Sequence, residues 1–138
     1  ALFRAAGSDV FHVMRRDAGR ARDFAERHGV ARWSTDAQAV LDDPEVTAVY
    51  VATPTASHAG YAVAAARAGK HVLVEKPMAM SAAEARGMVE AAEAAGVRLW
   101  VAYYRRALPR FVKVRELVAS GVLGRLLARA APRCARTP

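Results

Sequence analysis

The sequence has one cysteine, Cys134, and no long apolar run. A single cysteine excludes an internal disulfide and leaves no cysteine cluster for zinc, so we expect no metal site and a reducing, cytoplasmic setting. No apolar run approaches the roughly 20 residues that span a bilayer, and no basic and apolar leader opens the chain. We therefore expect a soluble protein without a membrane partner.

Acidic residues are scarce relative to basic ones. The chain has 21 Lys and Arg residues against 13 Asp and Glu, which gives a formal net charge of +8. Such an excess is typical of nucleic-acid-binding proteins. Here, however, the arginines are spread along the whole chain and do not alternate with aromatic residues in one block. We expect no nucleic-acid partner, and the same charge suits an anionic cofactor.

Closely spaced glycines are also missing, since no two glycines are separated by a single residue. What is present is a chain of 138 residues with 54% hydrophobic residues, which is typical of one globular domain. Short apolar runs alternate with helical segments along this chain. The expected strands are Asp9–Met14, Arg32–Trp33, Val46–Thr53, His71–Glu75 and Val97–Tyr104.

Capping residues mark the expected helices between these strands. Ser81 and Glu84 have the S-x-x-E spacing of a capping box. Two further helices are expected to start at Thr35 or Asp36 and at Ser57. The expected helix ends are Gly29, Gly69, Gly96 and Gly121.

The apolar run Val46–Thr53 has no alternation, which is typical of a strand buried on both faces. Strands of this kind that alternate with helices predict a parallel sheet covered on both sides, which is a doubly wound α/β fold. Short connections favour right-handed crossovers. Ligands of such folds bind at the carboxyl ends of the strands. The residues that follow each strand are therefore the candidate site.

Two arginines, Arg15 and Arg16, follow the first expected strand. In dinucleotide-binding folds an acidic residue near this place binds the ribose hydroxyls of NAD. Guanidinium groups cannot accept a hydrogen bond from a hydroxyl, but they bind a 2′-phosphate bidentately. The pair therefore indicates NADP, with two solvated surface arginines as the alternative.

The sequence Thr53-Pro54-Thr55 follows the third expected strand. Pro54 fixes φ where the strand stops, and Thr55 or Ser57 can cap the next helix. Backbone N–H groups at this helix start favour an anionic or polar ligand. His58 falls in the first helical turn, where we expect incomplete burial and where an ordinary surface histidine is the alternative.

The fourth expected strand ends in Glu75-Lys76-Pro77. A lysine held at the mouth of a cleft can donate a proton or stabilise negative charge, because partial burial readily changes its protonation. Pro77 stiffens the turn. A charged surface turn is the alternative.

These motifs occur together at matching separations. Thr53-Pro54-Thr55, His58, Gly69-Lys70 and Glu75-Lys76-Pro77 resemble the motifs of the Gfo/Idh/MocA family, named for glucose–fructose oxidoreductase and inositol dehydrogenase. The segment that ends in Tyr104-Arg105-Arg106 resembles a further strand end of the family, which usually carries Asn where this chain has tyrosine. The resemblance extends over most of the chain.

The resemblance implies a Rossmann-like domain and NAD(P)-dependent oxidation or reduction of a sugar, polyol or related compound. Lys76 matches the family's catalytic lysine, which approaches both the nicotinamide and the substrate hydroxyl. Arg16 matches an arginine of NADP-preferring members, so we expect NADP rather than NAD. The positions that match the family's cofactor cleft are Thr53, Pro54, Thr55, His58, Glu75, Lys76, Pro77 and Arg105.

The chain departs from the family pattern at both ends. The opening strand with its G-x-G-x-x-G fingerprint is absent, which would expose the edges of the two strands beside that central strand. We therefore expect a fragment, with residues 1–102 as a partial dinucleotide-binding domain. Residues 103–138 would then hold a crossing helix and the start of a substrate domain. A non-catalytic nucleotide-binding or regulatory module is the alternative function, and a homo-oligomer of the full-length protein stays open.

Overall fold

The computed structural model describes residues 7–124 of the chain. The chain divides into two compact units, Ala1–Ala102 and Tyr103–Pro138. Cys134 and the end of the expected second domain lie outside the described residues. Within residues 7–124 no helix is long and apolar enough to cross a bilayer.

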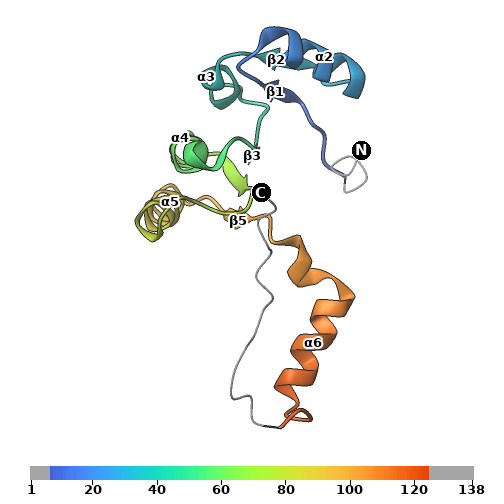
Figure 1. Cartoon of the computed structure of the whole chain (residues 1–138). Helices are drawn as coiled ribbons and strands as arrows, with labels where there is room; N and C mark the ends of the chain where they lie inside the picture. Colours follow the sequence, from blue (N-terminus) through green and yellow to red (C-terminus); the bar gives the residue numbers. More distant parts are fainter. Residues whose placement is uncertain (1–6, 125–138) are drawn as a thin grey trace, which may run out of the picture. The chain divides into compact units, whose positions relative to one another are not determined.

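In its described part, the first unit contains a two-stranded parallel sheet (Figure 1). Strand β1 (His12–Met14) pairs with β2 (Arg32–Ser34), and α2 (Ala18–His28) connects them. The carboxylate of Asp17 caps α2 by accepting a backbone N–H of the first turn at 2.8 Å. Gly29 ends the helix at φ 61°, a left-handed conformation that glycine adopts without a steric cost. Both helix ends lie where the sequence predicted them.

A second parallel sheet has the order β3-β4-β5. Its strands are β3 (Ala48–Val51), β4 (His71–Val74) and β5 (Leu99–Val101), and the connecting helices are α4 (His58–Arg67) and α5 (Ala82–Ala94). Figure 1 shows α4 and α5 on the same side of this sheet. Parallel strands joined by crossover helices confirm the predicted α/β class.

Among the described residues, one face of the β3-β4-β5 sheet is packed. Val51 is buried against α4, whereas its neighbour Tyr50 is 41% exposed and Trp100 of β5 is 48% exposed. The expectation that the run Val46–Thr53 is buried on both faces is wrong here, because side chains alternate along a strand and the helices cover one face. The buried core comprises Leu41, Val51, Ala62, Ala65, Ala66, Val72, Val74, Met88 and Ala92.

The two sheets are not joined by a strand pair in the part of the chain that is described, since β1 pairs with β2 and β3 with β4. In the usual doubly wound order, the first strand of the domain lies between the strands that correspond to β1 and β3. The break therefore falls where the sequence predicted a missing central strand.

Helix starts follow the predicted capping pattern. Asp36 caps α3 (Ala37–Leu41) with a hydrogen bond to its carboxylate. Ser81 Oγ accepts from the backbone N–H of Glu84 at 3.2 Å, and Glu84 Oε2 accepts from the backbone N–H of Met80 at 2.9 Å. The capping box of α5 is thus present, with its return bond shifted by one residue.

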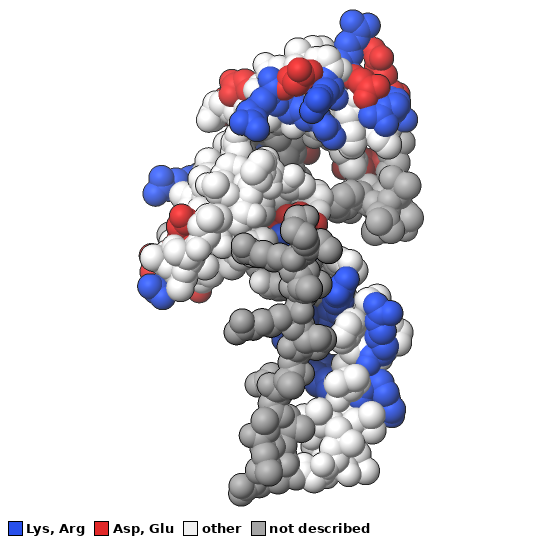
Figure 2. Space-filling view, viewed as in Figure 1, with Lys and Arg blue, Asp and Glu red and all other residues white. Residues whose placement is uncertain are grey.

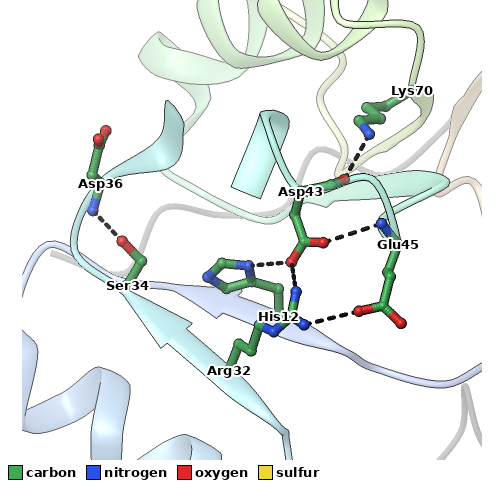
Figure 3. A network of polar contacts seen from close by, with 7 residues as sticks. All are labelled: His12, Arg32, Ser34, Asp36, Asp43, Glu45 and Lys70. Carbon is green, nitrogen blue, oxygen red and sulfur yellow. Dashed lines mark hydrogen bonds and ion pairs between the residues drawn. The ribbon is translucent and has the colours of Figure 1, made fainter. Parts of the chain in front are cut away.

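A polar network connects the amino ends of strands in both sheets (Figure 3). Asp43 is buried and accepts hydrogen bonds from His12 Nδ1 at 3.2 Å and from Arg32 Nη1 at 2.7 Å. Lys70 Nζ donates to the backbone oxygen of Asp43 at 2.8 Å, and Arg32 also pairs with Glu45. The guanidinium of Arg32 holds the pKa of Asp43 below its usual value. Because this network lies where the strands begin, the candidate site at their carboxyl ends is separate from it.

The second unit contains η2 (Tyr104–Ala107) and α6 (Pro109–Ala119). No side chain of residues 103–124 is buried. Figure 2 shows basic side chains along α6 on the visible face. The exposed apolar residues of this segment include Phe111, Val114, Leu117 and Val118. The start of a substrate domain predicted here stays a prediction.

Candidate active site at the strand carboxyl ends

Two of the predicted motifs lie side by side. Strands β3 and β4 run parallel with Val51 opposite Val74, so the turns that follow them begin at the same edge of the sheet. The backbone N–H of Glu75 donates to the oxygen of Val51 at 2.9 Å, which extends the pairing into the second turn. The turn at 53–55 therefore adjoins the turn at 75–77.

His58 lies between these two turns and is only 1% exposed. Its Nδ1 is 3.0 Å from the oxygen of Pro77, and its Nε2 is 2.8 Å from the oxygen of Thr53. The expectation of incomplete burial is wrong, because the ring points between the turns and finds backbone oxygens on both sides. Since both nitrogens contact the backbone, the ring presents no polar atom to a ligand in this structure.

The turn after β3 is held by hydroxyl groups. A short helix, η1 (Thr55–Ser57), precedes α4. Ser57 Oγ donates to the oxygen of Pro54 at 2.7 Å and lies 2.9 Å from the hydroxyl of Thr53. Ser57 occupies the cap position of α4, as the sequence predicted, but its side chain makes no cap hydrogen bond. Its hydroxyl instead points back into the turn and stabilises it.

Glu75 holds the turn after β4. Its Oε2 accepts from the backbone N–H of Lys76 at 3.0 Å, and its Oε1 accepts from the hydroxyl of Tyr50 at 2.6 Å. The hydrogen bond from Tyr50, followed by that from the Lys76 backbone, lowers the pKa of Glu75. Burial and this same hydrogen bond raise the pKa of Tyr50 to about 12. The carboxylate therefore fixes the backbone of the turn.

The side chain of Lys76 is exposed beside this fixed backbone, and the Lys76–Pro77 peptide bond is cis. The Lys76 ammonium makes no hydrogen bond or ion pair with residues 7–124. Two apolar hollows in this unit are lined by Met78 and residues of α5, one of them also by Val97, Leu99 and Val101. Lys76 lines neither hollow.

The predicted arginines occupy three different environments. Arg15 directly follows β1, and its guanidinium lies over the ring of Phe24 at 4.9 Å from the centroid. Arg16 is exposed at the start of the next turn. Arg105 belongs to η2 of the second unit.

The donors at these strand ends are an ammonium, threonine hydroxyls and guanidinium groups. Such groups suit a polar, anionic cofactor better than a cationic or apolar one. In the described part of the chain no group of histidine, cysteine or carboxylate side chains is placed to hold a metal ion.

Comparison with known proteins decides the family. The profile of the Gfo/Idh/MocA oxidoreductase family, which has an NAD-binding Rossmann fold, matches residues 1–103. The chain belongs to this family.

Relatives of this Gfo/Idh/MocA chain are longer proteins. It is 43% identical over 128 residues to an oxidoreductase of Formosa agariphila, which covers 93% of this chain and 40% of that protein. It is 40% identical over 125 residues to a 1,5-anhydro-D-fructose reductase of Ensifer adhaerens, which covers 91% of this chain and 38% of that protein. The chain thus spans about two fifths of these curated relatives.

Solved structures agree with this assignment. A probable dehydrogenase from Thermotoga maritima superimposes with a TM-score of 0.81 at 31% identity, over 90% of this chain and 38% of that one. Levoglucosan dehydrogenase, in complex with NADH and levoglucosan, superimposes with a TM-score of 0.78 at 30% identity, over 86% of this chain and 32% of that one.

Sequence reasoning missed the part that Tyr50 plays in the candidate site of this Gfo/Idh/MocA chain. Tyr50 stands opposite Leu73 in the sheet, and its hydroxyl reaches Glu75, the residue that directly follows β4. The available signal was a tyrosine within an otherwise aliphatic strand, but its partner depends on strand register.

Proposed function

We propose that this chain is part of an NAD(P)-dependent oxidoreductase that acts on a sugar, polyol or related compound, with Lys76 as a catalytic residue. The observation that carries the proposal is the exposed Lys76 next to the turn at 53–55, at the carboxyl edge of one parallel sheet. Doubly wound folds bind ligands at this edge. Relatives named 1,5-anhydro-D-fructose reductase and scyllo-inositol 2-dehydrogenase support the substrate class.

A bound nicotinamide ring would accept or supply the hydride. The Lys76 ammonium would donate a hydrogen bond to the substrate oxygen and stabilise the negative charge that develops there, or relay its proton. Thr53, Pro54 and Thr55 would line the nicotinamide end of the cofactor. Glu75 would hold the backbone from which Lys76 extends.

The arginines after β1 support NADP as the preferred cofactor. An exposed guanidinium at Arg16 suits a 2′-phosphate, whereas a ribose that lacks this phosphate calls for an acceptor. Phe24 restrains Arg15 next to it through the ring contact. We therefore expect kcat/KM for NADPH to exceed that for NADH.

The test replaces Lys76 with Met in the full-length protein and measures turnover of polyols and sugar aldehydes with NADP(H) and NAD(H). We expect kcat to fall by about 10²–10⁴-fold, because a positioned proton donor contributes that much, while the Kd for NADPH changes little. Lys113→Met is the control, since this exposed lysine lies on α6 next to Glu116. Unchanged turnover in Lys76→Met would remove the catalytic assignment. Tight NADPH binding without turnover in the unmodified protein would favour a non-catalytic nucleotide-binding module.

A further inference from the structure

Both ring nitrogens of His58 face atoms that can only accept hydrogen bonds. The backbone oxygens of Pro77 and Thr53 lie 3.0 and 2.8 Å away, well within hydrogen-bond distance. A neutral imidazole has one N–H, whereas the protonated ring has two. The ring is 1% exposed, so water has little access to replace a missing donor. A ring with a single N–H would hold the lone pair of its other nitrogen against a carbonyl oxygen at hydrogen-bond distance, so the contacts on both sides call for two donors.

We propose that His58 carries a proton on both ring nitrogens and acts as a positioning residue, which ties the turn after β3 to the turn after β4 and so fixes Lys76. The proposal rests on the proposed function only in that Lys76 is taken as the catalytic residue. His58 itself does not touch the substrate.

The contacts of His58 with Pro77 and Thr53 act on Lys76 through the backbone. Pro77 directly follows Lys76, and Thr53 begins the adjacent turn, so a rigid planar ring between their carbonyls sets the spacing of the two turns. From the other side, Glu75 accepts the backbone N–H of Lys76. The Lys76 backbone is therefore held both before and after the residue. A displacement of about 1 Å in such a group can lower a rate roughly 100-fold.

The first experiment counts the ring protons. Full-length protein with ¹⁵N-labelled histidine is studied by NMR at pH 7, and the ring signals of His58 are assigned by correlation with its sequentially assigned backbone signals. We expect both ring nitrogens of His58 to resonate as protonated nitrogens. One unprotonated nitrogen would overturn the proposal.

The second experiment removes the hydrogen bonds of His58 to Pro77 and to Thr53 one at a time. The side-chain amide of Asn lies near the position of Nδ1, so His58→Asn keeps a donor for Pro77, whereas His58→Gln places its amide near Nε2 and keeps a donor for Thr53. Because Pro77 adjoins the lysine, we expect kcat to fall by about 10- to 100-fold in His58→Gln and by no more than about threefold in His58→Asn. His28→Asn, an exposed position on α2, should leave kcat unchanged.

Several outcomes decide the matter. Equal losses in the two variants, or the reverse order, would overturn the positioning role, because a merely structural ring would not separate them by donor position. If neither variant folds, the proton count in the unmodified protein decides. If Lys76→Met retains full turnover while NMR shows two ring protons, the protonation of His58 is supported and the catalytic role of Lys76 in the proposed function is contradicted.

Discussion

Glu75 stabilises the backbone of the next residue in its motif, Lys76, by accepting a hydrogen bond from its N–H. An acid at the end of a buried strand suggests a ligand contact, but both of its oxygens are occupied by Tyr50 and by the Lys76 backbone. Its folded pKa lies below the ordinary value of 4.5. Its ionised form therefore stabilises the fold at a pH above that value, and the contribution is lost as the pH falls through the lowered pKa.

The substitution Tyr50→Phe tests this arrangement. Because the Tyr50 hydrogen bond is the largest cause of the lowered pKa, its removal should raise the pKa of Glu75 toward 4.5. Carboxyl ¹³C NMR over a pH titration measures the change. Tyr103→Phe, at an exposed position, is the control. A Glu75 pKa that stays where it was would show that the Lys76 backbone alone holds the carboxylate.

At the scale of elements, helix ends were the most predictable feature. The start of α5 follows from Ser81 and Glu84, and the end of α2 from Gly29, because caps depend on residues a few positions apart. The burial of β3 was less predictable, because it depends on which face the helices cover.

We expect Ser81→Ala to lower the free energy of unfolding by about 1 kcal/mol, since the N-terminal N–H groups of α5 lose an acceptor. Urea denaturation of the full-length protein measures the loss. Ser81→Asp restores an acceptor and should remain within a few tenths of a kcal/mol of the original protein. An equal loss in both variants would show that the cap contributes nothing specific.

At the scale of the whole first unit, the Asp43 network links segments that no strand pair joins. It brings together His12 of β1, Arg32 of β2, and Lys70, which directly precedes β4 (Figure 3). The guanidinium of Arg32 favours the charged form of this buried carboxylate in the folded state. The network therefore connects the two sheets at the edge opposite to the proposed site.

We expect Asp43→Asn to lower the thermal midpoint of the full-length protein at pH 7, because Arg32 and His12 lose a charged acceptor. The folded pKa of Asp43 lies below 3.8, so the original protein should lose stability as the pH falls below that value. The variant should show a shallower decline there. Thermal midpoints measured from neutral to acid pH check both effects, with exposed Asp42→Asn as the control. The same acid dependence in Asp43→Asn would contradict this role.

Family, fold class and most helix ends were determined by the sequence itself, because periodicity, caps and closely spaced motifs are local. The turns at 53–55 and 75–77 were also expected to meet, since parallel strands end at one edge. Only the tertiary structure decided the partners of Glu75 and His58. Tyr50 meets Glu75 across 25 positions, and His58 meets Pro77 across 19. Such contacts depend on strand register and on where a buried ring points, which no local pattern specifies.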